Sequence, residues 1–254
     1  MLTMRLSYVT GVLTLLGLLA SPLSATANSL LIWPIYPVIQ TDQQASALWL
    51  ENQGNQAVNM QLRIFSWSQE GGDDHYQPQQ SVVGSPPMMT IAPGERQMVR
   101  LIRQATPPAG REQAYRIIVD EIPALAPNVE PQNAPRAAVR LQMRYSLPLF
   151  VYGEGARPPE RLANHSSGLY PGLSWRIIQQ NGQPQLEIQN TGQHHVRLSQ
   201  VAFKQGATHE KVSKGLLGYV LPGNTRRWPL PSGVRPIGEL HAYILGESHR
   251  ISPK

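Results

Sequence analysis

The sequence contains no cysteine, so disulfide bonds, thiolate metal sites and cysteine nucleophiles are excluded. It is also poor in lysine: only four of its 22 basic residues are lysines, and all four lie at position 204 or later. The remaining basic residues are arginines, which favour bidentate pairing with carboxylates. The net charge is only +6, and no basic run with interleaved aromatic residues occurs. The composition therefore does not indicate nucleic-acid binding.

Motifs of catalysis and metal binding are missing as well. The sequence has no His-Glu-x-x-His, no aspartate-rich calcium loop, no Gly-x-Ser-x-Gly and no glycine-rich phosphate loop. His194 and His195 are adjacent, so on a strand they point to opposite faces and cannot chelate one metal together. We predict no metal, no cofactor and no enzymatic activity, and a secreted hydrolase is the least supported function.

Long hydrophobic runs are absent except at the N-terminus. Residues 9–20 are mainly apolar, follow Arg5, and precede the small residues Ala25-Thr26-Ala27. This is the pattern of a signal peptide, which predicts residues 1–27 as a cleaved segment and export of a chain that begins at Asn28. A retained membrane anchor is the alternative, but the run is short for a span of about 20 residues. No membrane insertion is predicted.

The rest of the sequence is dominated by a two-residue alternation of apolar and polar side chains. Short strands separated by turn residues are predicted throughout, and no long apolar stripe of helical period occurs. The predicted strands are 47–52, 58–67, 97–102, 114–121, 136–152, 173–178, 185–189, 196–202 and 239–244. The fold class is therefore all-β, with two β-sandwich domains. We place the first domain at 28–152, a linker at 153–159 and the second domain at 160–254.

One alternating segment has a possible role beyond the core. In residues 138–147, one face carries Val139, Leu141, Met143, Tyr145 and Leu147, and the segment follows a proline-rich loop at 124–135. An ordinary half-buried strand explains the pattern, and so does a strand that offers its apolar face to a partner. Burial of four such side chains would contribute about 6–12 kcal/mol before ordering costs.

Three blocks resemble the periplasmic pilus chaperones of the chaperone–usher pathway. Residues 85–101 carry a Pro-Pro, Pro-Gly and Val-Arg series that is similar to one family motif. Residues 110–123 run from Arg-Glu to Glu-Ile-Pro, like the family signature, and residues 145–150 resemble the end of the family's donor strand. The blocks follow the family's order across residues 31–152.

This resemblance implies two immunoglobulin-like domains in a boomerang arrangement, with a cleft between them. It further implies that the protein acts in the periplasm, binds pilus subunits by donor-strand complementation and delivers them to an outer-membrane usher. In that mechanism the chaperone fills the open groove of an incomplete subunit with its own strand. By position in the family's motif, the inserted residues are Val139, Leu141 and Met143, with Tyr145 as a fourth.

The sequence departs from the better-known members where they hold the C-terminal carboxylate of the subunit. Tyr36 and Pro148 stand at the two positions that are basic in those members, and the signature also differs at Gln113, Arg116 and Ile118. This resembles the divergent, archaic or alternative branch of the family. We predict Arg116 and Arg144 as substitute anchors, each worth about 1.5–3 kcal/mol as a charge-assisted hydrogen bond. A solvated strand face is the other interpretation of either arginine.

Two further expectations complete the interpretation. Arg100 and Glu121 are predicted to form a structural ion pair near the domain junction, and a binding role is the alternative for these two residues. The alternative function is a structural pilus subunit or surface adhesin with immunoglobulin-like domains. Such a protein needs an N-terminal strand to donate to a neighbour, and Pro34 and Pro37 would interrupt one in residues 28–40.

Overall fold

The computed structural model describes residues 30–123, 142–159 and 168–254. Strands β1 to β18 make up the secondary structure of these residues, in agreement with the all-β prediction. None of the described residues belongs to a helix long and apolar enough to cross a membrane.

The first domain is built from ten strands in two sheets. One sheet has the order β1-β3-β8-β6, and the other has the order β2-β10-β9-β4-β5 with β7 paired to β4. The strands are β1 (Leu30–Trp33), β2 (Val38–Ile39), β3 (Ala45–Asn52), β4 (Val58–Glu70), β5 (Asp73–Pro78), β6 (Val82–Ser85), β7 (Met88–Ile91), β8 (Arg96–Arg103), β9 (Glu112–Ile122) and β10 (Arg144–Tyr152).

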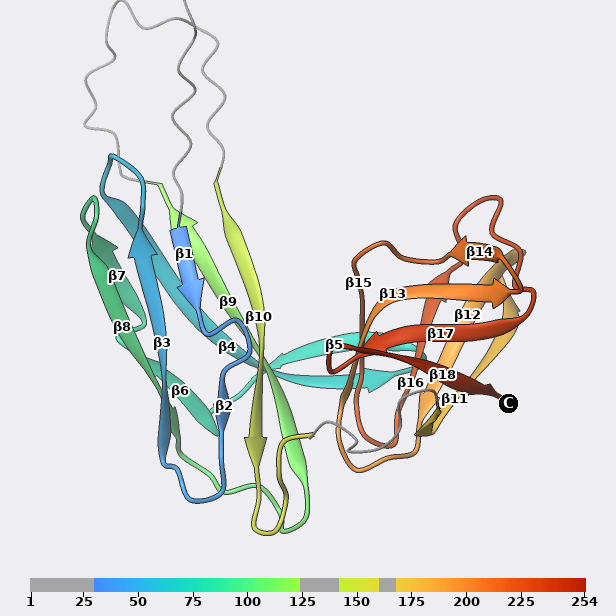
Figure 1. Cartoon of the computed structure of the whole chain (residues 1–254). Coiled ribbons are helices and arrows are strands. Elements are labelled where there is room, and N and C mark those ends of the chain that lie inside the picture. The colour runs from blue at the N-terminus through green and yellow to red at the C-terminus, as the bar shows by residue number, and fades with distance from the viewer. Residues whose placement is uncertain (1–29, 124–141, 160–167) are drawn as a thin grey trace, which may run out of the picture.

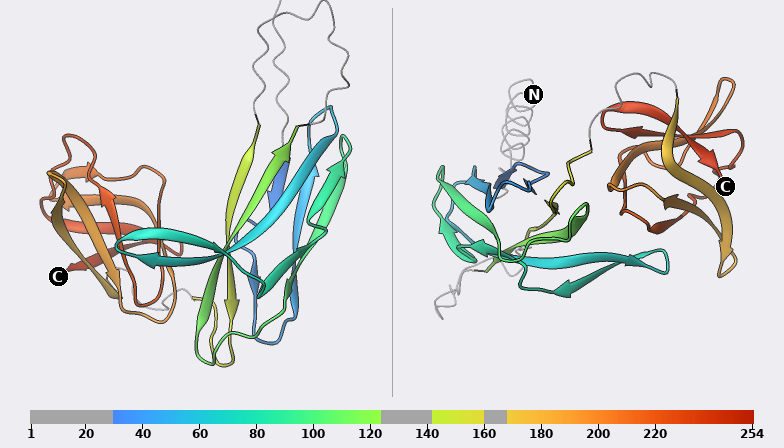
Figure 2. Two further views of the ribbon diagram at one scale, coloured as in Figure 1. Left: turned by 180° about the vertical axis from the view of Figure 1, so that it is seen from behind. Right: turned by 90° about the horizontal axis from the view of Figure 1, so that it is seen from below.

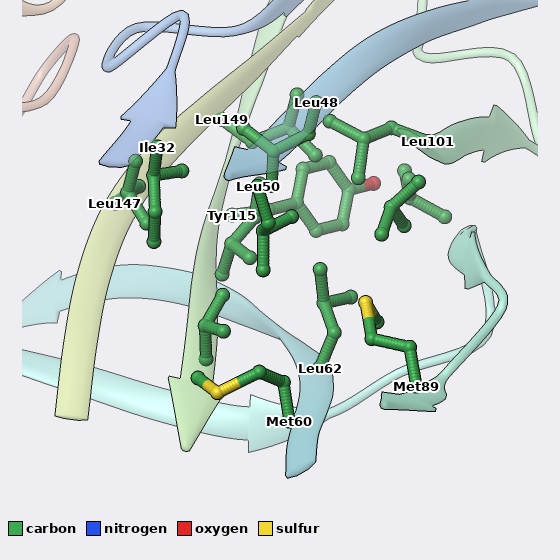
Figure 3. Close-up of a cluster of buried hydrophobic side chains, with 14 of the residues drawn as sticks. Ile32, Leu48, Leu50, Met60, Leu62, Met89, Leu101, Tyr115, Leu147 and Leu149 are labelled. Atoms are coloured by element: carbon green, nitrogen blue, oxygen red, sulfur yellow. The ribbon is translucent and has the colours of Figure 1, made fainter. Parts of the chain in front are cut away.

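The core of the first domain lies between these two sheets, as expected for a sandwich. Leu48 and Leu50 of β3 and Leu101 of β8 meet Leu62 of β4 and Leu149 of β10 (Figure 3). All five are buried, because the alternation along each strand turns every second side chain inward.

The second domain consists of eight strands in one sheet around a separate core. The strands are β11 (Leu169–Gln180), β12 (Gln183–Asn190), β13 (Val196–Gln205), β14 (Thr208–Lys211), β15 (Leu216–Val220), β16 (Thr225–Pro229), β17 (Glu239–Ile244) and β18 (Glu247–Pro253). Their order is β14-β13-β17-β18-β11-β12-β16, with β15 paired to β13. Phe203, Leu186 and Leu240 are among the fully buried residues of its core.

Most predicted strands are present, with different ends. The prediction at 239–244 coincides with β17, whereas β4 continues three residues beyond the predicted end at Trp67. Strand β10 begins at Arg144, and the predicted strand residues 136–141 lie outside the described part of the chain. The predicted linker at 153–159 follows β10 and contains no strand; the domain bounds themselves stay predictions.

The two domains meet at an angle, and the β4–β5 hairpin extends from the first domain to the second (Figures 1 and 2). A small apolar cluster joins them: Trp67, Phe150 and Tyr152 of the first domain pack with Tyr219 and Leu221 of the second. All five side chains are buried. The junction is therefore packed, and it holds the facing surfaces of the two domains in a fixed relative position.

Candidate functional site

Strand β10 has an open edge beside the region between the domains. It pairs with β9 along its whole length, from Arg144 opposite Asp120 to Tyr152 opposite Glu112. On its other side, β2 pairs only with Phe150 and Val151. Among the described strands, none pairs with the outer edge of residues 144–149. Pro148 suits this place, because proline within a sheet is confined largely to edge strands. Such an edge can accept a strand from another chain.

The apolar face of β10 continues beyond the first core. Leu147, Leu149 and Val151 are buried in that core, and Tyr145 packs against it. Met143, next on the same face, is 43 % exposed. Tyr145 therefore packs partly against the core of the first domain, whereas Met143 is accessible to a partner. The predicted donor residues Val139 and Leu141 lie outside the described residues.

A groove of about 350 Å³ runs beside this open edge. It is mainly apolar, and Arg116 is its one charged lining residue among the described positions. Both domains contribute to its walls, which are formed by Leu30, Ile32, Ile35, Tyr36, Arg116, Tyr145, Ser146, Leu147, Pro148, Leu216 and Tyr219.

Arg116 lies in this groove on β9, directly opposite Pro148 of β10. Its guanidinium carbon is 3.9 Å from the centre of the Trp67 ring and 5.9 Å from that of Tyr219. Its Nε is buried without a hydrogen-bond partner, and no described carboxylate forms a salt bridge with it. Aromatic faces partly offset the cost of burying a cation. Arg116 is therefore a positively charged group in the groove that pairs with no carboxylate of the described residues.

Arg197 of the second domain is a second arginine of this kind, and sequence reasoning missed it. Its guanidinium carbon is 5.4 Å from the centre of the Tyr36 ring, and its Nε is buried without a partner. Within the described chain it also forms no salt bridge. The only sequence signal was a charged residue alternating with Val196 and Leu198 on a strand. Its proximity to the groove depends on how the domains pack.

Tyr219 lies between the two arginines. Burial raises the pKa of its hydroxyl, the neighbouring Tyr36 raises it further, and Arg197 and Arg116 both lower it. Both guanidinium groups therefore act on one hydroxyl, although they belong to different domains. The groove has a positive end shared by the two domains.

Gln69 holds Tyr219 at this position. Its side-chain amide donates to the Tyr219 carbonyl at 2.9 Å and accepts from the Leu221 N–H at 2.8 Å. Gln69 is buried, so these bonds satisfy backbone groups that water does not reach. They tie the end of β4 to β15 and fix the second-domain wall of the groove.

Two arginines of β16 bind the tip of the β4–β5 hairpin. Arg226 donates to the Gly72 carbonyl at 2.5 Å, and Arg227 donates to the Gly71 carbonyl at 2.8 Å. Arg227 is in turn held by Glu187 at 2.8 Å. This second set of interdomain contacts restricts rotation of the domains about the packed junction.

Arg144, the second predicted anchor, is not in the groove. It faces Asp120 across β9 and β10 and forms a salt bridge with it, while Arg63 binds the same carboxylate at 2.6 Å. Burial raises the pKa of Asp120, but the hydrogen bonds from Arg144 and Arg63 outweigh burial and bring the pKa below its usual value. Arg144 is four residues from Pro148, roughly 13 Å along the strand. The structure therefore does not bring it together with Arg116.

The predicted ion pair of Arg100 with Glu121 is not formed. Arg100 lies on β8 in the sheet that contains β1, and Glu121 lies on β9 in the opposite sheet. The Glu121 carboxylate instead accepts from the Met143 N–H at 3.3 Å. In the register of β9 and β10, Asp120 is the residue opposite Arg144, and the two form a salt bridge.

Comparisons with known proteins place the chain in a family. Residues 36–156 match the model of the pili and flagellar-assembly chaperone, PapD N-terminal domain. Among solved structures, the chain is similar to the CsuC–CsuE chaperone–tip adhesion subunit pre-assembly complex from the archaic chaperone-usher Csu pili of Acinetobacter baumannii. The identity is 32 %, the match covers 89 % of this chain and 99 % of that chain, and the TM-score is 0.68.

More distant structures share the fold. The E. coli chaperone DraB is 20 % identical, with 89 % of this chain and 96 % of that chain covered and a TM-score of 0.58. The Pseudomonas aeruginosa CupB2 chaperone is 15 % identical, with 88 % and 100 % covered and a TM-score of 0.58. A sequence comparison with curated proteins finds no match. The motifs, the two-domain fold and these matches agree: the chain belongs to the family of pilus-assembly chaperones with a PapD-type N-terminal domain.

Proposed function

We propose that this chain is a periplasmic chaperone that binds pilus subunits by donor-strand complementation and delivers them to an outer-membrane usher. It acts by binding and not as an enzyme. The observation that carries the proposal is the open edge of β10 beside an apolar groove that ends at Arg116. The alternative, a structural subunit or adhesin, is not what the family membership supports.

In this mechanism β10 and the segment before it act as the donated strand. A subunit strand that pairs with residues 144–149 gains backbone hydrogen bonds worth about 0.5–1.5 kcal/mol each. Val139, Leu141 and Met143 fill the apolar groove of the subunit, with Tyr145 at the boundary of the chaperone's own core. Burial of each apolar side chain adds about 1.5–3 kcal/mol before ordering costs.

The groove supports a mechanism that would hold the bound strand in register. The end of a strand added to β10 meets Arg116 next to Pro148. We propose that the subunit's C-terminal carboxylate binds Arg116, with Arg197 as the second cation. We assign Arg144 to the pair with Asp120 and not to the anchor, because its guanidinium already binds a carboxylate and lies outside the groove.

Co-purification with a candidate pilus subunit tests strand donation. Leu141→Glu and Met143→Glu place a carboxylate on the proposed inserted face, so we expect both to lose the 1:1 complex while remaining folded. Gln142→Glu adds the same charge to an exposed neighbouring residue and should retain the complex. The proposal is contradicted if Leu141→Glu and Met143→Glu both retain the subunit. It is also contradicted if the wild-type protein does not retain it.

A further inference from the structure

A strongly basic hollow lies on the second domain, outside the proposed subunit site. It has a volume of about 390 Å³ and opens on the face formed by β13, β14 and β17. We call it the basic hollow; its lining residues are Gln200, Ala202, Lys204, His209, Lys211, Ser213, Lys214, His241, Tyr243 and Ser248. Strand β14 lies at the side of the second domain turned away from the first domain (Figure 1).

The strand register explains the shape of the basic hollow. Ala202 of β13 lies opposite Lys211 of β14 on one side and His241 of β17 on the other. Opposite residues on neighbouring strands have Cβ atoms about 4.5–5.5 Å apart. The small side chain of Ala202 therefore forms a floor between longer basic side chains. Lys204, two residues further on the same face, lies opposite His209.

The lysines of the basic hollow have no paired carboxylate among the described residues. Three of the chain's four lysines line it, and within the described part of the chain none of them forms a salt bridge. The nearest acid in register, Glu239 opposite Lys204, is held by Arg250 at 2.5 Å and by His241 at 3.4 Å. Burial lowers the pKa of His241, and the charge of Lys204 lowers it further.

Such a cluster has a cost for the folded protein. Three ammonium groups that line one hollow repel one another, and a ligand of opposite charge removes that penalty. The lining is also rich in donors, since Ser213, Tyr243 and Ser248 add hydroxyl groups to the ammonium groups. A ligand with several acceptor oxygens pointing in different directions matches this lining better than a planar carboxylate.

We propose that the basic hollow binds a phosphate-type oxyanion. Lysine binds phosphate as a point charge, and three lysines on flexible stems can converge on one tetrahedral group. The site is separate from the subunit site: Lys204 lies seven residues beyond Arg197 on β13, roughly 23 Å away. Both sites can therefore be occupied at once.

Titration of the full-length mature chain with pyrophosphate, followed by calorimetry at low ionic strength, tests this proposal. We expect the double variant Lys204→Gln, Lys211→Gln to weaken binding about tenfold or more. The matched control is Lys254→Gln, which removes the one lysine outside the basic hollow and should leave affinity within about twofold. Ala202→Leu keeps every charge but fills the floor, so it should weaken binding as well.

Two results would overturn the proposal. One is the absence of pyrophosphate binding by the wild type. The other is equal weakening by Lys254→Gln and by the double variant, which would indicate an effect of net charge and not a binding site.

Binding to lipid vesicles identifies the source of the oxyanion. Binding to phosphatidylglycerol but not phosphatidylcholine vesicles, lost in the double variant, assigns a lipid headgroup; pyrophosphate binding without vesicle binding assigns a soluble phosphate.

Discussion

Arg116 on β9 stacks over the indole ring of Trp67 on the paired strand β4, with its guanidinium carbon 3.9 Å from the ring centre. Stacking occupies a face of the planar guanidinium and leaves the N–H groups in its plane available to an acceptor. Trp67 also belongs to the cluster that joins the domains, so the proposed anchor Arg116 packs on a side chain of the domain junction.

Replacement of Arg116 by lysine separates charge from geometry. Lysine keeps the positive charge but cannot bind a carboxylate through two parallel hydrogen bonds or stack as a plane. We expect Arg116→Lys to weaken subunit binding about tenfold. Arg116→Gln should weaken it more, because it removes the whole charge-assisted hydrogen bond, worth about 1.5–3 kcal/mol. Surface plasmon resonance with a purified subunit measures both. Wild-type affinity in Arg116→Gln would remove this residue from the anchor.

Gln69→Ala tests the connection between β4 and β15. The substitution leaves the Tyr219 carbonyl and the Leu221 N–H without their partner in a buried place. Each unsatisfied group costs about 1–3 kcal/mol, so we expect the free energy of unfolding to fall by at least about 1 kcal/mol. Denaturant unfolding measures this change. Gln77→Ala, at an exposed position of β5, is the control, and an equal loss in both variants would contradict the assigned role.

Glu187 gives a pH-dependent prediction. Burial raises its pKa, but hydrogen bonds from Arg176 and Arg227 outweigh burial and bring the pKa below its usual value. A depressed folded-state pKa stabilises the protein above the unfolded value, about 4.3 for glutamate, and this contribution disappears as the pH falls through the folded value. We expect Glu187→Gln to lower the free energy of unfolding by about 1–3 kcal/mol at pH 7.

The difference between wild type and Glu187→Gln should stay constant down to about pH 5 and shrink below about pH 4.3. Chemical unfolding at several pH values measures it. A difference that grows toward acid pH would show that the carboxylate does not contribute through these ion pairs.

The hairpin tip offers a matched pair of glycine substitutions. Gly71 and Gly72 both have positive φ, 62° and 95°, so alanine is strained at either position. A Cβ at Gly71 meets nothing within 4 Å, whereas a Cβ at Gly72 lies 2.7 Å from Arg227 Cδ. We expect Gly72→Ala to lower the melting temperature more than Gly71→Ala, because Arg227 is fixed by Glu187 and by the Gly71 carbonyl. Equal melting temperatures would show that Arg227 moves aside freely.

Local sequence patterns predicted much of the first domain. Alternation located β3, β4, β8 and β9, because a sandwich buries every second side chain and that period is visible in the chain itself. The motif blocks identified the family and directed attention to Arg116. Nothing local in the sequence showed that the turn at Gly71-Gly72 is bound by arginines of the second domain.

Contacts between the domains were not predictable in the same way. Arg197 and Gln69 acquire their roles from residues far away in the sequence, and each looks like an ordinary polar residue on a strand. Arg100, the partner predicted for Glu121, lies in the opposite sheet, which local sequence did not reveal. Two acids are adjacent on β9, and only the register with β10 decides that Asp120 meets Arg144.

The most direct test of the account compares one subunit with two C-termini, a free carboxylate and an amide, in binding to wild type, Arg116→Gln and Arg197→Gln. We expect wild type to bind the free carboxylate about tenfold or more tightly than the amide. Arg116→Gln should lose this preference, and Arg197→Gln should reduce it. Equal binding of the two subunit forms by the wild-type chain would contradict the carboxylate anchor on which the account depends.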